Sequence, residues 1–341
     1  MTSRWRNRPD GANWGEFGDD DQIGRLNLLT PVKVRQGVDE VREGITFCLS
    51  LPLDYPGGSV LNPRRKPPRL AATVREGRAN YVYPLSLENS EHSDVICDDT
   101  VLLTLQYSTQ FDSLAHVGGM FDADGDGAPE PVFYNGWRGG EHILAPADEG
   151  MIEGVAAERL GIENMAARGV QGRAVMIDLE KHVGRAREWI GHARLMAILE
   201  EDGVEIESGD MVCLYTGFAD MLLEMGGEPD ERVHQSCAVL DGRDPALLQW
   251  VSDSGIAVLI ADNYAVEGHP AKPPAEPGVH ASLPLHEHCL FKLGLHLGEL
   301  FHLGPLAHWL REHGRTRFLL TASPLRLPGA VGSPVPAVAT V

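Results

Sequence analysis

Short apolar runs alternate with amphipathic stretches from about residue 170 onward, and this alternation constrains the fold more than any other feature of the sequence. The apolar runs, which predict buried strands, are RAVMIDL (173–179), DMVCLYTG (210–217), IAVLIAD (256–262) and RFLLTASPL (317–325). The stretches between them predict helices over 187–203, 244–255 and 303–314. Such strands and helices predict an α/β fold. Because residues 80–120 indicate more strands without helices, we expect a mixed β-sheet core with flanking helices.

The first 70 residues differ from the rest in being rich in glycine, proline and aspartate. One helix is predicted over residues 30–44, where Thr30 would cap the helix and Pro31 would take the first helical position. The remainder of this segment is expected to be irregular. We therefore predict that residues 1–70 form an N-terminal arm and a helix that packs on the core.

The net charge of −20 argues against a nucleic-acid-binding protein, because phosphate recognition depends on clustered lysine and arginine. NPRRKPPR (62–69) is the one locally basic segment. Its prolines favour an exposed arm or linker, and the alternative is a patch for an anionic ligand or a partner subunit. We expect no membrane partner and a cytoplasmic protein, because the sequence shows neither a long apolar span nor a secretory signal.

QYSTQFDSLAHVGG (106–119) carries the most informative polar pattern. If this stretch is extended, alternate side chains share one face. That face would carry Gln106, Gln110, Asp112 and His116. Such a polar face is unfavourable for stability unless water or a ligand satisfies it, so the pattern indicates a binding pocket.

Other motifs narrow the choice of chemistry. No GxGxxG or GxxxxGK[ST] motif occurs, so we expect no nucleotide cofactor. FDADGDG (121–127) begins like an EF-hand loop but has Phe133 where that loop needs glutamate, which favours a simple turn. LHEHCLFKLGLHLGEL (285–300) supplies a set that fits either metal ligands or a solvated helix face, namely His286, Glu287, His288, His296 and Glu299.

Taken together, these stretches resemble a cyclase family whose better-known members are bacterial kynurenine formamidases and isatin hydrolases. The family motif is HxGTHxDxPxH, and QYSTQFDSLAH matches its threonine, aspartate and final histidine. Further blocks that resemble the family in the same order are WGEFGDDDQIGRLNLLTP, RAVMIDL, SGDMVCLYTGF, IADNYAVEGHP, LHEHCLFKLGLHLGELF and SPLRLPGAVGSPVPAVA. The resemblance implies a swivelling β/β/α-like fold, with residues 71–341 as a single cyclase-like catalytic domain.

The resemblance also implies roles for individual residues. Asp112 would be a metal ligand, and His116 would act as the catalytic acid or base. His286 and Glu299 would complete the site, although His288 competes with His286 for this place. The departures are Gln106 and Gln110, which stand where the family has metal-binding histidines, and an amide oxygen is a weaker ligand for zinc than imidazole.

The family resemblance leaves three functions open. The first is hydrolysis of a small cyclic or aromatic amide-like or ester substrate by activated water, with Asp112, His116 and Glu299 as catalytic groups and manganese or a weakly held zinc as cofactor. The second is a metal-free cyclase or lyase that uses the same pocket. The third is a small-ligand-binding protein without catalysis. The resemblance further implies a homodimer or homotetramer, and residues 52–70 could cross to another subunit.

Overall fold

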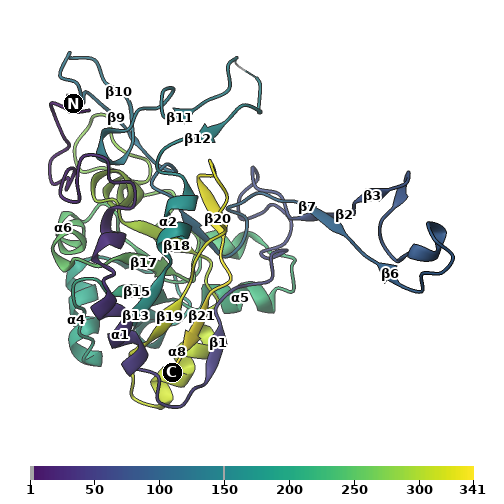
Figure 1. Ribbon diagram of the computed structural model, residues 1–341. Coiled ribbons are helices and arrows are strands. Elements are labelled where there is room, and N and C mark those ends of the chain that lie inside the picture. The colour runs from purple at the N-terminus through teal and green to yellow at the C-terminus, as the bar shows by residue number, and fades with distance from the viewer. Residues whose placement is uncertain (1–3, 149) are drawn as a thin grey trace.

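A nine-stranded mixed sheet forms the centre of the computed structural model, which describes residues 4–148 and 150–341 (Figure 1). In spatial order its strands are β1 (Thr46–Cys48), β21 (Val338–Thr340), β19 (Arg317–Thr321), β13 (Gln171–Asp178), β15 (Met211–Tyr215), β17 (Val258–Ala261), β18 (His296–Glu299), β8 (Gln110–Asp112) and β20 (Gly332–Pro334). The four strands β13, β15, β17 and β18 are parallel, and the strands on either side of them run antiparallel. The predicted mixed α/β fold is therefore confirmed.

Helices cover both faces of the sheet. The helices are α1 (Pro31–Asp39), α2 (Ile162–Arg168), α3 (Leu179–Val183), α4 (His192–Asp202), α5 (Phe218–Glu224), α6 (Pro245–Ser254), α7 (Pro284–His286), α8 (Gly304–Glu312), the π-helix η5 (Glu287–Lys292) and the 3-10 helices η1 (Gly24–Leu28), η2 (Leu85–Leu87), η3 (Tyr134–Gly136) and η4 (Glu231–His234). Small two-stranded sheets outside the centre pair β9 (Gly119–Phe121) with β10 (Glu130–Val132), β11 (Ile143–Leu144) with β12 (Ala156–Ala157), and β14 (Trp189–Ile190) with β16 (Val239–Leu240).

The alternation of side chains along β13 shows how two cores form. Val175 and Ile177 belong to the apolar cluster that contains residues of α4 and α6. Ala174 and Met176 point to the opposite face and join the cluster that contains residues of α2 and α8. Because β13 is apolar on both faces, it is buried between two helical layers, as a central parallel strand should be.

The N-terminal helix α1 packs directly on the backbone of β13. A Cβ atom at Gly37 would lie 2.7 Å from the carbonyl carbon of Gly172, so only glycine allows this approach. An ion-pair network fixes the helix further. Lys33 Nζ lies 3.0 Å from Asp210 Oδ1 and 2.9 Å from Glu207 Oε2, and Arg173 bonds the same two carboxylates.

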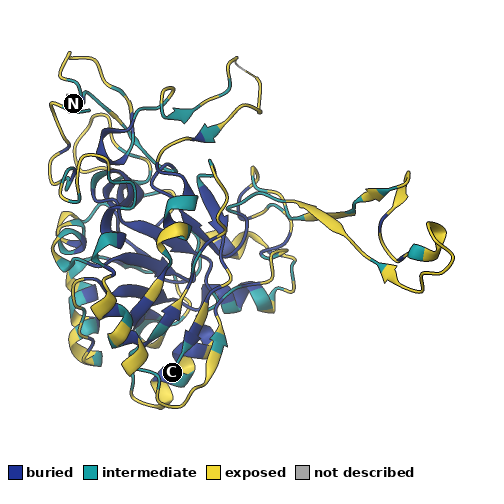
Figure 2. Ribbon diagram, in the orientation of Figure 1, coloured by how far each residue is buried: buried dark blue, intermediate teal, exposed yellow. Residues whose placement is uncertain are grey.

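Residues 69–102 form a ribbon that projects from the body of the molecule, and we call it the arm (Figure 1). It consists of β2 (Arg69–Ala72) paired with β7 (Asp99–Leu102), β3 (Val74–Arg75) with β4 (Arg78–Ala79), and β5 (Tyr83–Pro84) with β6 (Val95–Ile96). Figure 2 shows that most of it is exposed. Its exposed large apolar side chains are Leu70, Val74, Tyr81, Val82, Leu87, Val95, Val101 and Leu102. The predicted boundary at residue 70 falls inside β2.

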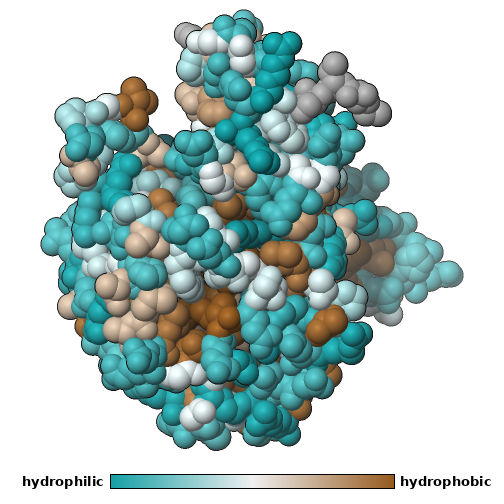
Figure 3. Space-filling model, turned by 90° about the vertical axis from the view of Figure 1, so that its left-hand side faces the viewer, coloured by the Kyte–Doolittle hydropathy of each residue, from teal (hydrophilic) through white to brown (hydrophobic). Residues whose placement is uncertain are grey.

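The molecular surface is mainly polar. Hydrophilic side chains cover most of the face shown in Figure 3, and hydrophobic ones gather there in smaller groups. Within the described parts of the chain, we find no helix that combines the length and the apolar character needed to cross a bilayer.

Two sequence predictions need local correction. The helix predicted over 187–203 begins only at His192, because residues 189–190 form β14 and pair with β16. The stretch 106–116 is not continuously extended, since β8 covers only 110–112 and turns lie on both sides. The amide of His116 donates to the carbonyl of Ser113, which closes the second turn.

Candidate active site

The candidate active site lies where β18 and β8 pair. Glu299 is the last residue of β18, and its backbone is paired with that of Gln110 in β8. Asp112 ends β8 and pairs on its other side with Gly332 of β20. The antiparallel pairing therefore brings residues from distant parts of the sequence to one edge of the sheet.

A cluster of buried polar groups results from this pairing. Gln110 Nε2 donates to Glu299 Oε2 at 3.1 Å. His286 Nε2 lies 3.2 Å from Glu299 Oε1 and 3.9 Å from Asp112 Oδ2. All four residues are at most 2% exposed, so bulk water has little access to these contacts.

Three oxygen atoms of this cluster are buried and have no hydrogen-bond partner among the described residues: both carboxylate oxygens of Asp112 and Oε1 of Gln110. Buried polar atoms without partners are costly and need an explanation, such as an ion. Asp112, His286 and Glu299 offer ligand atoms that lie within 4.8 Å of one another and could hold a metal ion. The unpartnered oxygens and this grouping fit a bound cation.

The protonation properties of the cluster follow from burial and charge. Burial raises the pKa of Asp112 above its usual value. Burial alone would also raise the pKa of Glu299, but the hydrogen bond and charge of His286 outweigh this effect and lower it. Burial lowers the pKa of His286, whereas Glu267 and Glu299 raise it more strongly, to about 10. The raised pKa values of Asp112 and His286 mean that these groups hold protons which a bound cation would have to displace.

Glu267 fixes the orientation of His286. Its Oε1 atom accepts from His286 Nδ1 at 2.8 Å and from the His286 amide at 2.9 Å, which leaves Nε2 facing Asp112 and Glu299. The preceding residues Ala265 and Val266 have φ angles of 74° and 58°, which are uncommon for residues with a Cβ atom. This backbone positions a fully buried carboxylate behind the histidine, as partners of metal-binding histidines are positioned.

His116 stands at the entrance to the cluster. Its Nε2 atom lies 3.8 Å from Asp112 Oδ1, and its side chain is 23% exposed. A cavity of about 400 Å³ opens in front of it, and His286 and Glu299 also line this cavity. A small molecule in the cavity can therefore reach the buried carboxylates and His116 together.

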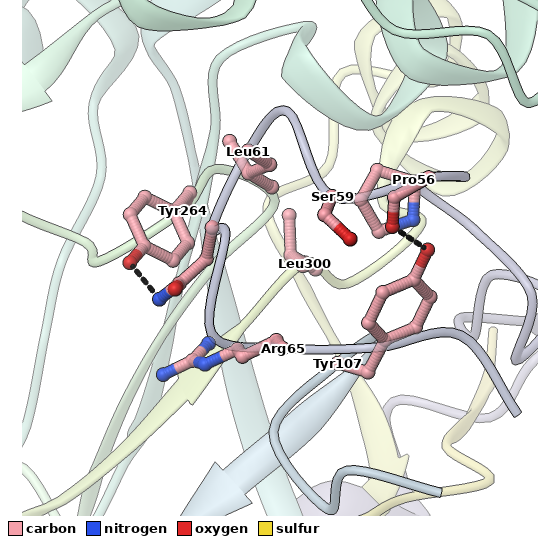
Figure 4. A pocket seen from close by; sticks show the side chains of 9 residues that line it. Pro56, Ser59, Leu61, Arg65, Tyr107, Tyr264 and Leu300 are labelled. Carbon is pink, nitrogen blue, oxygen red and sulfur yellow. Dashed lines mark hydrogen bonds between the residues drawn. The ribbon is translucent and has the colours of Figure 1, made fainter.

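Residues of the N-terminal segment form the opposite wall. Arg65 donates to the carbonyl of Gln106 at 2.6 Å and lies 3.9 Å from Glu299 Oε2. Asn62 donates to the hydroxyl of Tyr264 at 2.9 Å (Figure 4). A hollow of about 10 Å³, at the lower limit for one water, lies beside Arg65 and Tyr107. Figure 4 shows the side chains that line it.

The other predicted site residues have different positions. His288 points away, because its ring bonds the hydroxyl of Ser252 at 2.9 Å, so His286 is the histidine that faces the cluster. Gln106 lines the cavity, and its amide lies over the backbone of Gly332. The geometry thus brings together Gln110 and the three carboxylate and imidazole groups already described, and leaves Gln106 at the wall.

Glu267 was missed by sequence reasoning, because its sequence signal was only its place in IADNYAVEGHP. His296 was among the possible metal ligands, but its Nδ1–H donates to the carbonyl of Asp112 at 2.9 Å. Burial lowers the pKa of His296 to about 4, so it is a neutral donor that supports the backbone of β8. The place of Glu267 follows no spacing pattern that sequence alone makes specific.

The fold and the site define an α/β protein with a buried cluster of carboxylates and histidine beneath a small-molecule cavity. The profile of the family described as "Putative cyclase" matches residues 49–268. The chain therefore belongs to this cyclase family. A search of curated protein sequences finds no match.

Solved structures support the same assignment. One described as a novel cyclase is 28% identical with a TM-score of 0.72, and the match covers 97% of each chain. Isatin hydrolase A from Labrenzia aggregata, bound to benzyl benzoate, is 14% identical with a TM-score of 0.54, covering 89% of this chain and 94% of that one. Isatin hydrolase A from Ralstonia solanacearum is 14% identical with a TM-score of 0.55, covering 86% and 91%. At 14% identity these two matches show the fold alone.

Proposed function

We propose that the protein is a hydrolase that acts on a small cyclic or aromatic amide-like (C–N) or ester substrate. The observation that carries this proposal is the set of unpartnered buried oxygens of Asp112 and Gln110 beside His286 and Glu299. Membership of the cyclase family supports a hydrolase-like activity on a small molecule. The cavity of about 400 Å³ suits a substrate with one or two rings.

Asp112, His286 and Glu299 would hold a divalent ion, with Gln110 Oε1 as a further oxygen near them. This set is rich in oxygen and has a single imidazole, which favours manganese over zinc. When bound, such an ion polarises a carbonyl and makes a water molecule more acidic. With such an ion bound, Glu267 would keep His286 in the tautomer whose Nε2 lone pair faces the site.

His116 would act as the general base and then as the general acid. Its Nε2 atom lies near Asp112 and faces the cavity, so it can take a proton from an attacking water and return it to the leaving nitrogen or oxygen. Arg65 beside Glu299 would help to hold that carboxylate in place. The low exposure of the cluster would limit competing water.

A second candidate is a metal-free cyclase or lyase on the same pocket. It is favoured by the pKa of His286, which is raised to about 10, because a protonated His286 would offset one of the two negative charges of Glu267 and Glu299 without an ion. In that case Asp112 and His116 would supply the acid and base directly.

One set of experiments separates these candidates. The wild-type protein is analysed for metal after gentle purification, and the chelator-treated protein is titrated with MnCl₂ and ZnCl₂ by calorimetry. Turnover is assayed on cyclic imides, lactams, formamides and aryl esters, with Asp112→Asn and His116→Ala as variants. The hydrolase proposal expects Asp112→Asn to lose metal and activity, and His116→Ala to lose activity but keep metal.

Other outcomes contradict the hydrolase. Turnover that is indifferent to chelator favours the metal-free enzyme. Tight binding of the test compounds without turnover in the metal-loaded wild type favours a ligand-binding protein that lacks catalysis.

We also propose that the chain forms a homodimer or homotetramer through the arm. A two-stranded ribbon is marginally stable in water unless a further surface covers it. Leu70 of β2 and Leu102 of β7 belong to paired strands of this ribbon. Their side chains are 74% and 75% exposed, so the body of the molecule does not cover them. A second copy of the chain would bury them.

A further inference from the structure

The basic segment NPRRKPPR (62–69) is held firmly over the cavity. The amide of Arg64 bonds Asn62 Oδ1 at 3.0 Å, and that of Lys66 bonds Thr104 Oγ1 at 3.0 Å. The Asn62 side chain in turn donates to the hydroxyl of Tyr264. The segment is therefore a fixed wall of the candidate site and not a loose linker.

Its cations point in two directions. Arg64 and Arg65 line the cavity. Lys66 turns away, since its Nζ atom donates to the carbonyl of Pro63 and the hydroxyl of Ser59. The segment thus directs two guanidinium groups, but not its lysine, at the space that a substrate would occupy.

The charge balance of the cavity wall differs from that of the whole chain. Although the net charge is −20, this wall carries two arginines and one carboxylate, together with three histidines and Tyr264. Besides Tyr264, these residues are Arg64, Arg65, His116, His269, His286 and Glu299. Two arginines on one cavity wall of an acidic protein are a local feature that solubility does not explain.

The two arginines differ in how many hydrogen-bond and ion-pair partners their side chains have. Arg65 is partly satisfied by the Gln106 carbonyl and by Glu299, and its guanidinium lies 5.5 Å from the ring centre of Tyr264. The Arg64 side chain has no ion pair or hydrogen bond to any residue in the described ranges. Arg65 is therefore held in position, and Arg64 has all of its donors available.

We propose that Arg64, supported by Arg65, binds a carboxylate of the substrate, so that the site acts on anionic rather than neutral amide-like or ester compounds. The choice of reaction rests on the proposed function, whereas the binding of the carboxylate does not. Guanidinium binds carboxylate through two parallel hydrogen bonds, which also fixes the orientation of the bound molecule. The carboxylate at this wall would leave the reactive carbonyl to face His116 and Asp112.

A binding experiment tests the inference without turnover. Benzoate and benzamide have nearly the same shape and differ in charge. Their affinities for the wild-type protein are measured by calorimetry or ligand-observed NMR at millimolar concentration and low salt. We expect benzoate to bind about tenfold more tightly than benzamide, which corresponds to one charge-assisted hydrogen-bonding group.

Variants of the same segment supply the control. Arg64→Gln should lower the affinity for benzoate about tenfold and leave that for benzamide unchanged. Lys66→Gln removes the same charge from the same segment, but it should change neither affinity by more than about twofold, because Lys66 faces away from the cavity. Equal binding of the two compounds, no binding of either, or equal effects of the two variants would each overturn the inference.

Matched substrates separate this inference from the proposed function. The pairs are formanilide with 2-formamidobenzoate, and dihydrouracil with dihydroorotate, and in each pair the second compound adds a carboxylate. Faster turnover of the anionic member by the wild type, with this preference lost in Arg64→Gln, supports both proposals. Selective binding of benzoate without turnover of any compound refutes the hydrolase alone, and faster turnover of the neutral members refutes the carboxylate site alone.

Discussion

His116 differs from the other polar residues of the site because it is partly exposed and turns toward the cavity. We predict that His116→Ala lowers kcat about a hundredfold to ten-thousandfold, the usual range for loss of a general acid or base. Manganese binding, measured by calorimetry, should stay within about threefold of wild type because the three grouped ligand residues are intact. A variant that loses metal and activity together would instead place His116 among the ligands.

Gln110 offers a direct test of the departure from the family motif. Its amide is fully buried, donates to Glu299, and leaves Oε1 without a partner. We predict that Gln110→His raises the affinity for zinc relative to manganese by at least about tenfold, because imidazole is a better ligand for zinc than an amide oxygen. Competition titration of the two ions measures this ratio. An unchanged ratio in a folded variant would show that residue 110 does not face the ion.

Glu267 is expected to act through His286. We predict that Glu267→Gln lowers the affinity for manganese by about 10- to 100-fold, as is usual when the partner of a ligating histidine is changed. NMR of the His286 ring nitrogens should show a loss of the single tautomer that the hydrogen bond to Nδ1 enforces. Glu276→Gln, a change on an exposed loop, serves as the control and should alter neither property.

At the scale of elements, the contact between α1 and the sheet depends on ion pairs that respond to acid. Hydrogen bonds from Lys33 and Arg173 lower the pKa of Glu207 from 4.5 to about 2. Because the folded-state pKa is the lower one, this stabilisation is complete above about pH 4.5 and is lost as the pH falls through 2.

We therefore predict a pH-dependent difference in unfolding free energy between the wild type and Glu207→Gln. The difference should be constant above about pH 5, shrink as the pH falls, and be nearly absent at about pH 2. Urea titrations at a series of pH values measure it. Glu205→Gln is the matched control, since Glu205 is 82% exposed in its pair with Arg317 and should give a small difference. A Glu207 difference that grows in acid would contradict the assignment.

The arm supplies the second prediction at this scale. Replacing both Leu70 and Leu102 by serine should shift the protein toward the monomer, as light scattering after size-exclusion chromatography would show, because these side chains are the most exposed leucines of the ribbon. Met120→Ser, which changes an exposed apolar residue of β9, should leave the mass unchanged. A monomeric wild type would refute the proposed assembly.

For the whole molecule, the sequence was informative where a pattern is local. Apolar runs between amphipathic stretches predicted β13, β15, β17 and β19, because strand burial depends on short stretches of side chains. The predicted start of α4 was wrong, because residues 189–190 pair as β14 with the distant β16 although their sequence continues the helical pattern. Long-range pairing of this kind leaves no local signal.

The same distinction applies to the site. The resemblance to a family identified Asp112 and Glu299, and the structure places their side chains in one buried cluster. Glu267 could not be predicted, since its role depends on an uncommon backbone at residues 265–266 that turns the carboxylate toward His286. The contribution of Arg64 also depends on tertiary structure, because only the anchored loop shows which way each cation faces.

The pairing of β8 has a consequence for the time at which the site can form during synthesis. β8 is flanked by β18 and β20: Asp112 pairs with Gly332, and its neighbour Phe111 pairs with Gly298. A nascent chain on the ribosome has to pass residue 334 before both neighbours exist, although Asp112 emerged long before. Until then the site lacks the strands that bring Asp112 and Glu299 together. Binding of the proposed ion should therefore follow completion of the sheet.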